Sequence, residues 1–513
     1  MADIISFNPA TLEEIGRTNV TPTPKVMEYV AEARAAYSIW DRMGFAERGK
    51  RLLKAREYLL DHVDDFARTI TLDNGKPLVE ALTAEIFPVA DLIHYFAHNA
   101  ERLLKGSKVP IGVMGLLRRS SRISFRPIGV VGIISPWNYP FSIPAGETAM
   151  ALICGNAVLL KPSSATALVG RKIEEMFSVA GLPPGVFRHL PGDAATGETL
   201  TTSSIGKLFF TGSVGAGRQV MAACARNLTP LVLELGGKDP MIVRADADME
   251  QATSGAVWGA FTNCGQCCAS VERVYVHESI FDRFVKMCVE KAARLKVGNG
   301  LEAGTDIGAM TTLDQLQKVE AHVEDAISRG AKIRCGGERI RDMRGHFFPP
   351  TIITGIDHSF ACVRDETFGP LMPVMPFVDD MQAIRFANDT AYGLTASVWS
   401  RDIGTAERMA REIRAGTVMI NDCVFTHALS QTPWGGCKAS GFGRSHSRFG
   451  LQEMVEIRHV HTNRLRRKDI WWYGYDSPLY SNFAKLARHL TGGVFSQIRA
   501  VPSFARLWFK KKL

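Results

Sequence analysis

The run Ala157-Val-Leu-Leu-Lys161 is short, apolar and bounded by turn-forming residues, which is typical of a buried strand. Similar runs occur at residues 122–134, with a break at a proline, and at residues 185–190 and 207–211. Helical apolar spacing fills the segments between them. Strands that alternate with helices in this way predict βαβ units and a parallel, doubly wound sheet.

The same alternation returns later in the chain. Residues 23–104 have helical spacing with few breakers, whereas residues 233–421 again alternate between apolar runs and helical segments. A chain of 513 residues is too long for one ordinary core. We therefore expect an α/β protein with two doubly wound parallel-sheet domains.

Composition narrows the class of protein. Hydrophobic residues make up 46% of the chain and charged residues 22%, which is typical of a globular enzyme. No apolar run approaches the roughly 18 residues of a membrane-spanning helix, and the first residues lack the pattern of a signal peptide. The ten cysteines form no regular framework, which indicates a reducing compartment. The sequence thus predicts a cytoplasmic protein without disulfides.

The net charge of +9 lies entirely in the last fifty residues. Arg464 to Leu513 contain eleven basic and two acidic residues, so the first 463 are formally neutral. A neutral body predicts no nucleic-acid partner. The tail mixes these cations with interfacial aromatics, which fits an anionic membrane surface, but the aromatics could equally pack on the enzyme or on a second subunit. The apolar residues that share one predicted helical face are Leu479, Tyr480, Phe483, Leu486 and Leu490.

Three strand-ending segments could bind a ligand, each with a plain structural alternative. Residues 209–218 leave a strand and enter a helix, where free N–H groups bind phosphate, although a tight turn needs the same glycines. Lys161 with Ser163 and Ser164 could bind ribose hydroxyls or a 2′-phosphate, or could be solvated. Asn138, between two prolines, either points its amide at a ligand or caps its own turn.

A reactive thiol and a carboxylate occur in two glycine-rich segments. Cys268 ends the run Phe261-Thr-Asn-Cys-Gly-Gln-Cys-Cys268, and Glu234 lies 34 residues earlier, in Leu-Glu-Leu-Gly-Gly-Lys. A thiol supplies a nucleophile and a carboxylate supplies a base, which together indicate thioester chemistry. No second ligand pair at zinc-site spacing accompanies Cys264, Cys267 and Cys268, so we expect no metal.

Seven motifs in fixed order resemble the aldehyde dehydrogenase superfamily over residues 20–463. They are Pro-Trp-Asn-Tyr-Pro, Lys-Pro-Ser-Ser, Phe-Thr-Gly-Ser, Glu-Leu-Gly-Gly-Lys, Phe-x-Asn-x-Gly-Gln-x-Cys, Asp-Glu-Thr-Phe-Gly-Pro, and the run from Pro433 to Gly443. The resemblance implies oxidation of an aldehyde to the carboxylic acid with NAD or NADP. It also implies a Rossmann-like cofactor domain (1–107 and 128–233), a catalytic domain (234–451) and an oligomerisation arm (108–127 and 452–463), followed by the tail (464–513).

The resemblance assigns three catalytic residues. Cys268 would attack the aldehyde, Asn138 and the Cys268 N–H would bind the resulting oxyanion, and Glu234 would activate the water that hydrolyses the thioester. Relatives that pass the acyl group to coenzyme A generally lack this glutamate, so hydrolysis is favoured. The alternatives are a coenzyme A-acylating enzyme and a non-catalytic scaffold associated with a membrane.

The resemblance also assigns binding residues. A serine at 164, where many NAD-preferring relatives have glutamate, removes a charge that would repel a 2′-phosphate and permits NADP. The small residues at 146 and 428 imply a wide tunnel for a bulky or long-chain apolar aldehyde. The cofactor set is Trp137, Lys161, Ser164, Gly212, Ser213, Gly217, Glu366 and Phe368, and the substrate set is Tyr139, Ile143, Gly146, Ala428 and Trp434.

Overall fold

The structure is a computed structural model that describes residues 3–116, 118–465, 468–469, 471–490 and 492–510. It divides into two compact units. The first consists of residues 1–103 and 127–455, and the second of residues 104–126 and 456–513. None of the helices in these described ranges is long and apolar enough to cross a bilayer.

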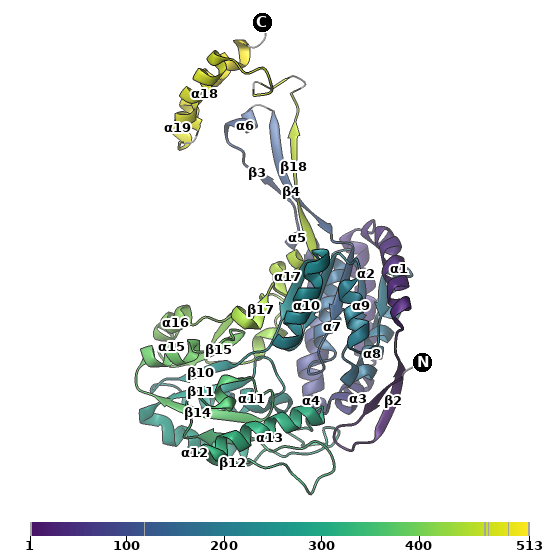
Figure 1. The fold of residues 1–513 in the computed structure, drawn as a ribbon, viewed down its shortest axis with the longest axis vertical. Helices are drawn as coiled ribbons and strands as arrows, with labels where there is room; N and C mark the ends of the chain where they lie inside the picture. Colours follow the sequence, from purple (N-terminus) through teal and green to yellow (C-terminus); the bar gives the residue numbers. More distant parts are fainter. Residues whose placement is uncertain (1–2, 117, 466–467, 470, 491, 511–513) are drawn as a thin grey trace. The chain divides into compact units, whose positions relative to one another are not determined.

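A six-stranded sheet forms one half of the first unit (Figure 1). Its strand order is β17-β9-β8-β5-β6-β7, and all pairs are parallel except β17 with β9. The strands are β5 (Val130–Ile134), β6 (Ala157–Lys161), β7 (Phe187–His189), β8 (Lys207–Thr211), β9 (Leu231–Glu234) and β17 (Gly441–Phe442). The helices that connect them are α7 (Ser142–Ile153), η2 (Ser164–Thr166), α8 (Ala167–Ser178), α9 (Ala194–Thr202) and α10 (Val214–Asn227).

A seven-stranded sheet forms the other half. Its order is β12-β13-β14-β11-β10-β15-β16, parallel throughout except where β12 pairs with β13. Its strands are β10 (Asp239–Val243), β11 (Val271–His277), β12 (Lys332–Cys335), β13 (Thr351–Thr354), β14 (Leu371–Phe377), β15 (Thr395–Trp399) and β16 (Thr417–Ile420). The accompanying helices are α11 (Met249–Phe261), η3 (Thr262–Gly265), η4 (Glu278–Ile280), α12 (Phe281–Ala292), α13 (Leu313–Ser328), α14 (Ala361–Arg364), α15 (Asp380–Asn388) and α16 (Ile403–Glu412).

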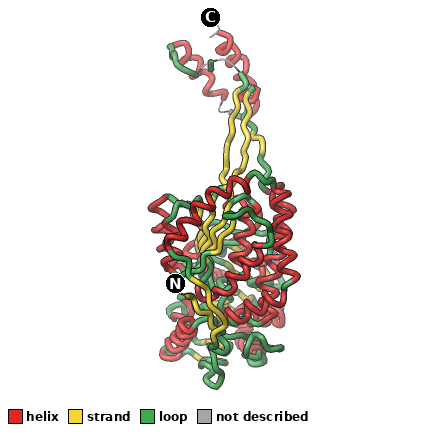
Figure 2. Tube along the Cα trace, turned by 90° about the vertical axis from the view of Figure 1, so that its right-hand side faces the viewer, coloured by secondary structure: helices red, strands yellow, loops and turns green. Residues whose placement is uncertain are grey.

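The two sheets confirm the predicted α/β class with two largely parallel sheets. Helices flank the strands of both (Figure 2). The short elements after β16 are η5 (Phe425–Ala428), η6 (Lys438–Ser440) and α17 (Ser447–Glu453). The chain returns through β17 from the second sheet to the first, so the segment after Trp434 contributes to both halves of the unit.

The N-terminal section is helical, as its spacing predicts, but a hairpin of β1 (Asp3–Phe7) and β2 (Glu14–Asn19) precedes it. The alternation signal for these strands is weak because most of their residues are exposed. The helices are α1 (Thr23–Asp41), α2 (Phe45–Asp61), α3 (Val63–Asn74), α4 (Leu78–Glu80), the π-helix η1 (Ala81–Ile86) and α5 (Phe87–Leu103).

The second unit combines a three-stranded sheet with the basic tail. The sheet, in the order β18-β4-β3, contains β3 (Ser107–Val109), β4 (Arg119–Pro127) and β18 (Val455–Asn463), and the helices are α6 (Val113–Leu116), α18 (Ser477–Leu490) and α19 (Val494–Lys510). Arg119 forms a buried ion pair with Asp469 and lies 4.5 Å from the ring centroid of Trp471. The start of the tail therefore packs on the strands of its own unit.

Only part of the apolar face predicted for α18 is exposed to solvent. Leu479 and Leu486 are buried while Tyr480 is 78% exposed, and α18 packs against α19. The side chain of Leu490 and residues 511–513 lie outside the described part of the chain. The sequence reveals a helical face but not which neighbouring helix covers it.

Candidate active site

The Cys268 loop, residues 262–270, comprises η3 and the turn that leads to β11, and its backbone is strained. Asn263 and Cys264 adopt left-handed conformations, with φ of 51° and 54°. Gly265 has φ of 69°, and a Cβ there would approach the carbonyl oxygen of Gly369 to 2.1 Å. The loop is held by Glu80, whose carboxylate accepts hydrogen bonds from the Asn263 N–H (3.0 Å) and the Thr262 hydroxyl (2.7 Å). Such contacts offset the backbone strain.

A buried ion pair holds the loop of Asn138. Lys76 Nζ lies 2.6 Å from Glu85 Oε1, donates to the carbonyl of Asn138 at 2.9 Å, and lies 4.1 Å from the ring centroid of Tyr139. Glu85 Oε2 accepts from the backbone N–H groups of Phe141 and Ser142 at the start of α7. The pair thus fixes both ends of the segment that carries Asn138, and no sequence motif pointed to it.

The Asn138 amide faces the Cys268 loop. Its Nδ2 donates to the carbonyl of Gln266 at 3.0 Å, while Asn263 Nδ2 donates to the carbonyl of Asn138 at 2.9 Å. A primary amide has two N–H groups. One N–H of Asn138 therefore fixes the loop and the other can meet an oxyanion.

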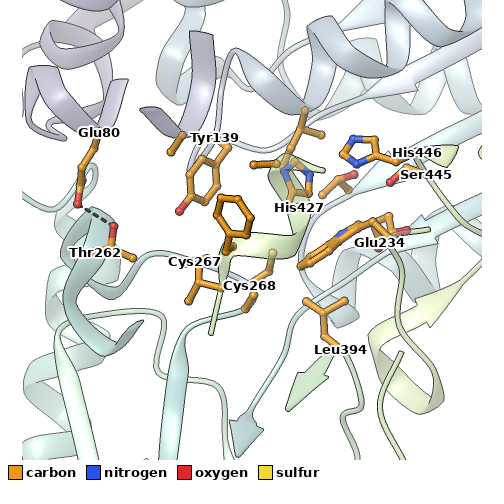
Figure 3. A pocket seen from close by; sticks show the side chains of 18 of the residues that line it. Glu80, Tyr139, Glu234, Thr262, Cys267, Cys268, Leu394, His427, Ser445 and His446 are labelled. Carbon is orange, nitrogen blue, oxygen red and sulfur yellow. Dashed lines mark hydrogen bonds between the residues drawn. The ribbon is translucent and has the colours of Figure 1, made fainter. Parts of the chain in front are cut away.

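Cys268 and Glu234 line one cavity of about 220 Å³ (Figure 3). Its wall is mostly apolar and aromatic, and it includes four of the five predicted substrate residues: Tyr139, Ile143, Ala428 and Trp434. Gly146, which is also on α7, is absent from the lining, and a Cβ there would point to Leu92 at 3.3 Å. Among the described residues that line this cavity, none is a lysine or an arginine.

Glu234 ends β9 with its carboxylate buried. Neither carboxylate oxygen has a hydrogen-bond partner within the described part of the protein. Burial raises the pKa of Glu234 well above its usual range; the charge of Glu147 adds to this, and Arg444 opposes it. A buried carboxylate with no protein donor is suited to accept a proton from a small molecule in the cavity.

The Cys268 thiol is protonated in this environment. A hydrogen bond with the Cys267 thiol and burial raise the pKa of Cys268 well above its usual range, and the carboxylates of Asp239 and Glu234 add to that effect. Since the thiolate is the nucleophile, Cys268 needs a base or a positive charge at the moment of attack.

A second cavity of about 160 Å³ approaches Cys268 and shares Ile143, Thr211, Glu234 and Leu235 with the first. The predicted cofactor residues in its lining are Trp137, Gly212, Ser213, Glu366 and Phe368. Lys161, Ser164 and Gly217 are not in the lining. Lys161 ends β6, Ser164 begins η2, and Gly217 lies in α10, where a Cβ would approach Leu235 to 2.6 Å.

The second cavity suits a dinucleotide. Gly212 and Ser213 precede the N-terminus of α10, where unpaired backbone N–H groups attract phosphate. The buried Thr211 hydroxyl has no partner among the described residues. A Cβ at Gly236 would approach Glu366 Oε1 to 2.4 Å, so the missing side chain leaves room for this carboxylate. Glu366 accepts from the Gly237 N–H at 2.9 Å and can accept a ribose hydroxyl.

Comparison with known proteins assigns the family. The family model described as "Aldehyde dehydrogenase family" matches residues 2–460. The chain belongs to the aldehyde dehydrogenase family. The predictions of this family, of an oxidoreductase and of an NAD(P) cofactor are thereby confirmed at the level of the family, which oxidises diverse aldehydes. The assignments of individual residues and of domain boundaries stay predictions.

Individual aldehyde dehydrogenases cover almost the whole chain. The 4,4′-diapolycopene aldehyde oxidase of Methylomonas sp is 41% identical over 94% of this chain and 90% of that protein. The betaine aldehyde dehydrogenase of Bacillus subtilis is 37% identical, covering 89% and 93%. The crystal structure of the Staphylococcus aureus betaine aldehyde dehydrogenase with NAD⁺ has a TM-score of 0.87 at 33% identity, covering 92% and 94%.

The sequence analysis did not predict several residues that line the first cavity. Glu147 lies in the apolar helix α7, in which every residue is buried, and a lone acid in such a helix is a signal that could have revealed it. His427 and His446, whose ring centroids are 4.9 Å apart, also line the first cavity. Burial lowers the pKa of His427 to about 4 and that of His446 well below its usual range, so both rings are neutral.

Proposed function

We propose that this aldehyde dehydrogenase oxidises a bulky or long-chain apolar aldehyde to its carboxylic acid. The observation that carries the proposal is one mostly apolar cavity lined by both Cys268 and Glu234. The absence of lysine and arginine from its described lining argues against an aldehyde that bears a second carboxylate, because that charge would be buried without a partner. The printed name of the Methylomonas relative, 4,4′-diapolycopene aldehyde oxidase, supports an apolar substrate.

Residues of this chain carry out the step before hydride transfer, which is addition of the thiol to the aldehyde, and the step after it, which is hydrolysis of the thioester. The Cys268 thiol loses its proton to solvent, and its sulfur forms a bond to the aldehyde carbon as the carbon–oxygen double bond opens. The Cys268 N–H and the free N–H of Asn138 stabilise the resulting negative oxygen. Trp137, Gly212, Ser213, Glu366 and Phe368 would hold NAD(P)⁺, which when bound supplies a positive charge and the acceptor for the substrate's hydride. Glu234 then takes a proton from water as the water oxygen attacks the thioester carbon, and the carbon–sulfur bond breaks.

Serine at position 164 supports the use of both dinucleotides. It begins η2 directly after the strand that ends in Lys161, and it places no negative charge beside that lysine. An NADP 2′-phosphate would therefore meet a cation and hydroxyls instead of a carboxylate.

Purified protein is expected to show a kcat/KM that rises with aldehyde chain length, with either NAD or NADP. Each buried CH₂ contributes about 0.8 kcal/mol, so extension from acetaldehyde to decanal should raise kcat/KM by at least 100-fold. Initial rates of NAD(P)H formation across C2 to C10 aldehydes measure this directly. Betaine aldehyde and succinate semialdehyde serve as charged comparisons, and a preference for either of these would overturn the apolar assignment.

The second unit has an edge strand, β18, through which copies of the chain could pair to form a homo-oligomer. This nine-residue strand lies at the edge of its sheet, and most of its residues are exposed. An unpaired edge presents backbone N–H and C=O groups to another strand. Light scattering during size exclusion tests this, since a monomeric mass at micromolar concentration would contradict the proposal.

The tail supports peripheral contact with an anionic bilayer. Val494, Phe495, Ile498 and Val501 share one face of α19 and are 71%, 86%, 59% and 38% exposed. Trp472, Tyr473 and Tyr475 are also exposed, and the tail carries the whole net charge of +9. Exposed apolar and aromatic side chains amid cations are what an anionic membrane surface binds.

Phe495→Glu is expected to weaken binding to vesicles that contain phosphatidylglycerol by tenfold or more. Loss of a buried phenylalanine removes about 1.5–3 kcal/mol, and the added carboxylate is repelled by the lipid charge. Co-sedimentation at increasing salt measures the effect, with Met381→Glu on α15, which is 56% exposed, as the matched control. Equal binding of both variants, or no binding by the wild type, would overturn the membrane assignment.

A further inference from the structure

We propose that Glu147 is a second carboxyl group of the hydrolytic step, a positioning residue that holds the attacking water against Glu234. This proposal rests on the proposed thioester hydrolysis and adds a residue to it. Glu147 projects from α7, whereas Glu234 ends β9, so two different elements of the six-stranded-sheet region supply the two carboxyls.

The two carboxyl groups share one cavity and have oxygens without a hydrogen-bond partner among the described residues. Both residues line the cavity that also contains Cys268. Glu147 is 5% exposed and its Oε2 accepts no hydrogen bond from the described residues, and the same holds for both oxygens of Glu234. Buried polar atoms are rarely left unsatisfied. The cavity has room for water, and a water molecule there would satisfy the carboxyls from both sides.

Electrostatics couple the two carboxyls, which titrate as a pair. Burial raises the pKa of Glu147 to about 8, with no cation opposing it. Glu234 also has a raised pKa, but it has Arg444 nearby to favour its charged form. Two buried carboxylates in one site repel each other, so such a pair carries a single negative charge near neutral pH. Hydrolysis uses the form of the pair in which Glu234 carries the charge, which Arg444 favours, and Glu147 carries the proton.

The other titratable groups around Glu234 do not replace Glu147. Glu453 adds a negative charge, the Cys268 thiol is protonated, and His427 and His446 on the cavity wall are neutral. Glu80 also lines the cavity, but its carboxylate accepts hydrogen bonds from the Thr262 hydroxyl and the Asn263 N–H. Glu147 is therefore the second carboxyl of the cavity that acts electrostatically on Glu234.

A neutral acid and a carboxylate together can orient one water molecule. The water donates a hydrogen bond to Glu234 and accepts one from the Glu147 hydroxyl, which leaves its second lone pair free to attack. During attack the oxygen–carbon bond forms, the water proton moves to Glu234, and the carbon–sulfur bond to Cys268 breaks. Glu147 keeps its proton throughout, so the step balances without a further reactant.

The test compares Glu147→Gln with Glu147→Leu. Glutamine retains a neutral donor of similar shape, whereas leucine removes it. p-Nitrophenyl acetate acylates the thiol without a cofactor, so the p-nitrophenolate burst reports acylation and the slow phase reports hydrolysis. We expect full bursts in both variants, a slow phase within about threefold of wild type for glutamine, and one reduced about 10- to 100-fold for leucine.

The pH dependence of the slow phase distinguishes a positioning role of Glu147 from a role in packing alone. In the wild type, the slow phase should rise with pH as the pair of carboxyls loses its first proton and should fall at higher pH as the pair loses its second proton, because Glu147 is then no longer a donor. Glu147→Gln should keep the rise and lose the fall. A leucine variant that hydrolyses as fast as wild type, or a glutamine variant that keeps the alkaline fall, would overturn the proposal. A wild type without any burst would instead overturn the proposed thioester chemistry.

Discussion

Cys268→Ala is expected to lower the rate of aldehyde oxidation by about 10⁴-fold or more, because it removes the sulfur that we propose bonds to the aldehyde carbon. Dinucleotide binding should change by less than about twofold, since the second cavity is built mainly from other residues. Stopped-flow NAD(P)H formation measures the first quantity, and quenching of tryptophan fluorescence on titration with NADP measures the second.

Two further cysteines serve as controls for this substitution. Cys437→Ala removes a half-buried thiol outside both cavities and should leave the rate unchanged. Cys267→Ala removes the hydrogen-bond partner that helps to raise the pKa of Cys268, so it should shift the pH dependence of acylation to lower pH. Loss of activity in Cys267→Ala with activity retained in Cys268→Ala would transfer the nucleophile to Cys267.

Glu234→Gln is expected to leave a burst of one NAD(P)H per subunit and to slow subsequent turnover by about 10²- to 10⁴-fold. The amide cannot take a proton from water, so the acyl group remains on Cys268. Intact-mass spectrometry of the quenched enzyme should show the mass of the acyl adduct. A variant that turns over without a burst would show that another residue is the base.

The pH dependence of this step has a defined sign. Glu234 acts as a base only when it is ionised, and burial raises its pKa. Hydrolysis should therefore increase with pH through a midpoint that lies above the usual glutamate value of about 4.3. In Glu234→Gln this rise should disappear, while the pH dependence of acylation stays.

The predictions from sequence hold best where one local pattern determines the result. Alternating apolar runs indicate both sheets because a buried parallel strand needs little more than a short β-branched or aliphatic run. The motifs around Glu234, at the end of β9, and Cys268, before β11, lie beside the same cavity.

Residues that act through tertiary partners are harder to predict. Lys76 and Glu85 are nine residues apart in a helical section, and nothing in that spacing indicates that they hold Asn138. Leu479 and Leu486 show a helical face but not that α19 packs on α18. Contacts of this kind depend on which segment, distant in the sequence, packs against the residue in the folded protein.

The two cavities meet only at a few residues around Cys268 and Glu234. Trp258, Phe425, His427 and Ala428 belong to the first cavity alone, while Trp137, Ser213 and Phe368 belong to the second alone. Substitutions in the first group would leave the residues that we predict to bind the cofactor unchanged. An enzyme organised in this way can change its aldehyde specificity through substitutions in the first cavity. Its oxidation chemistry then stays the same.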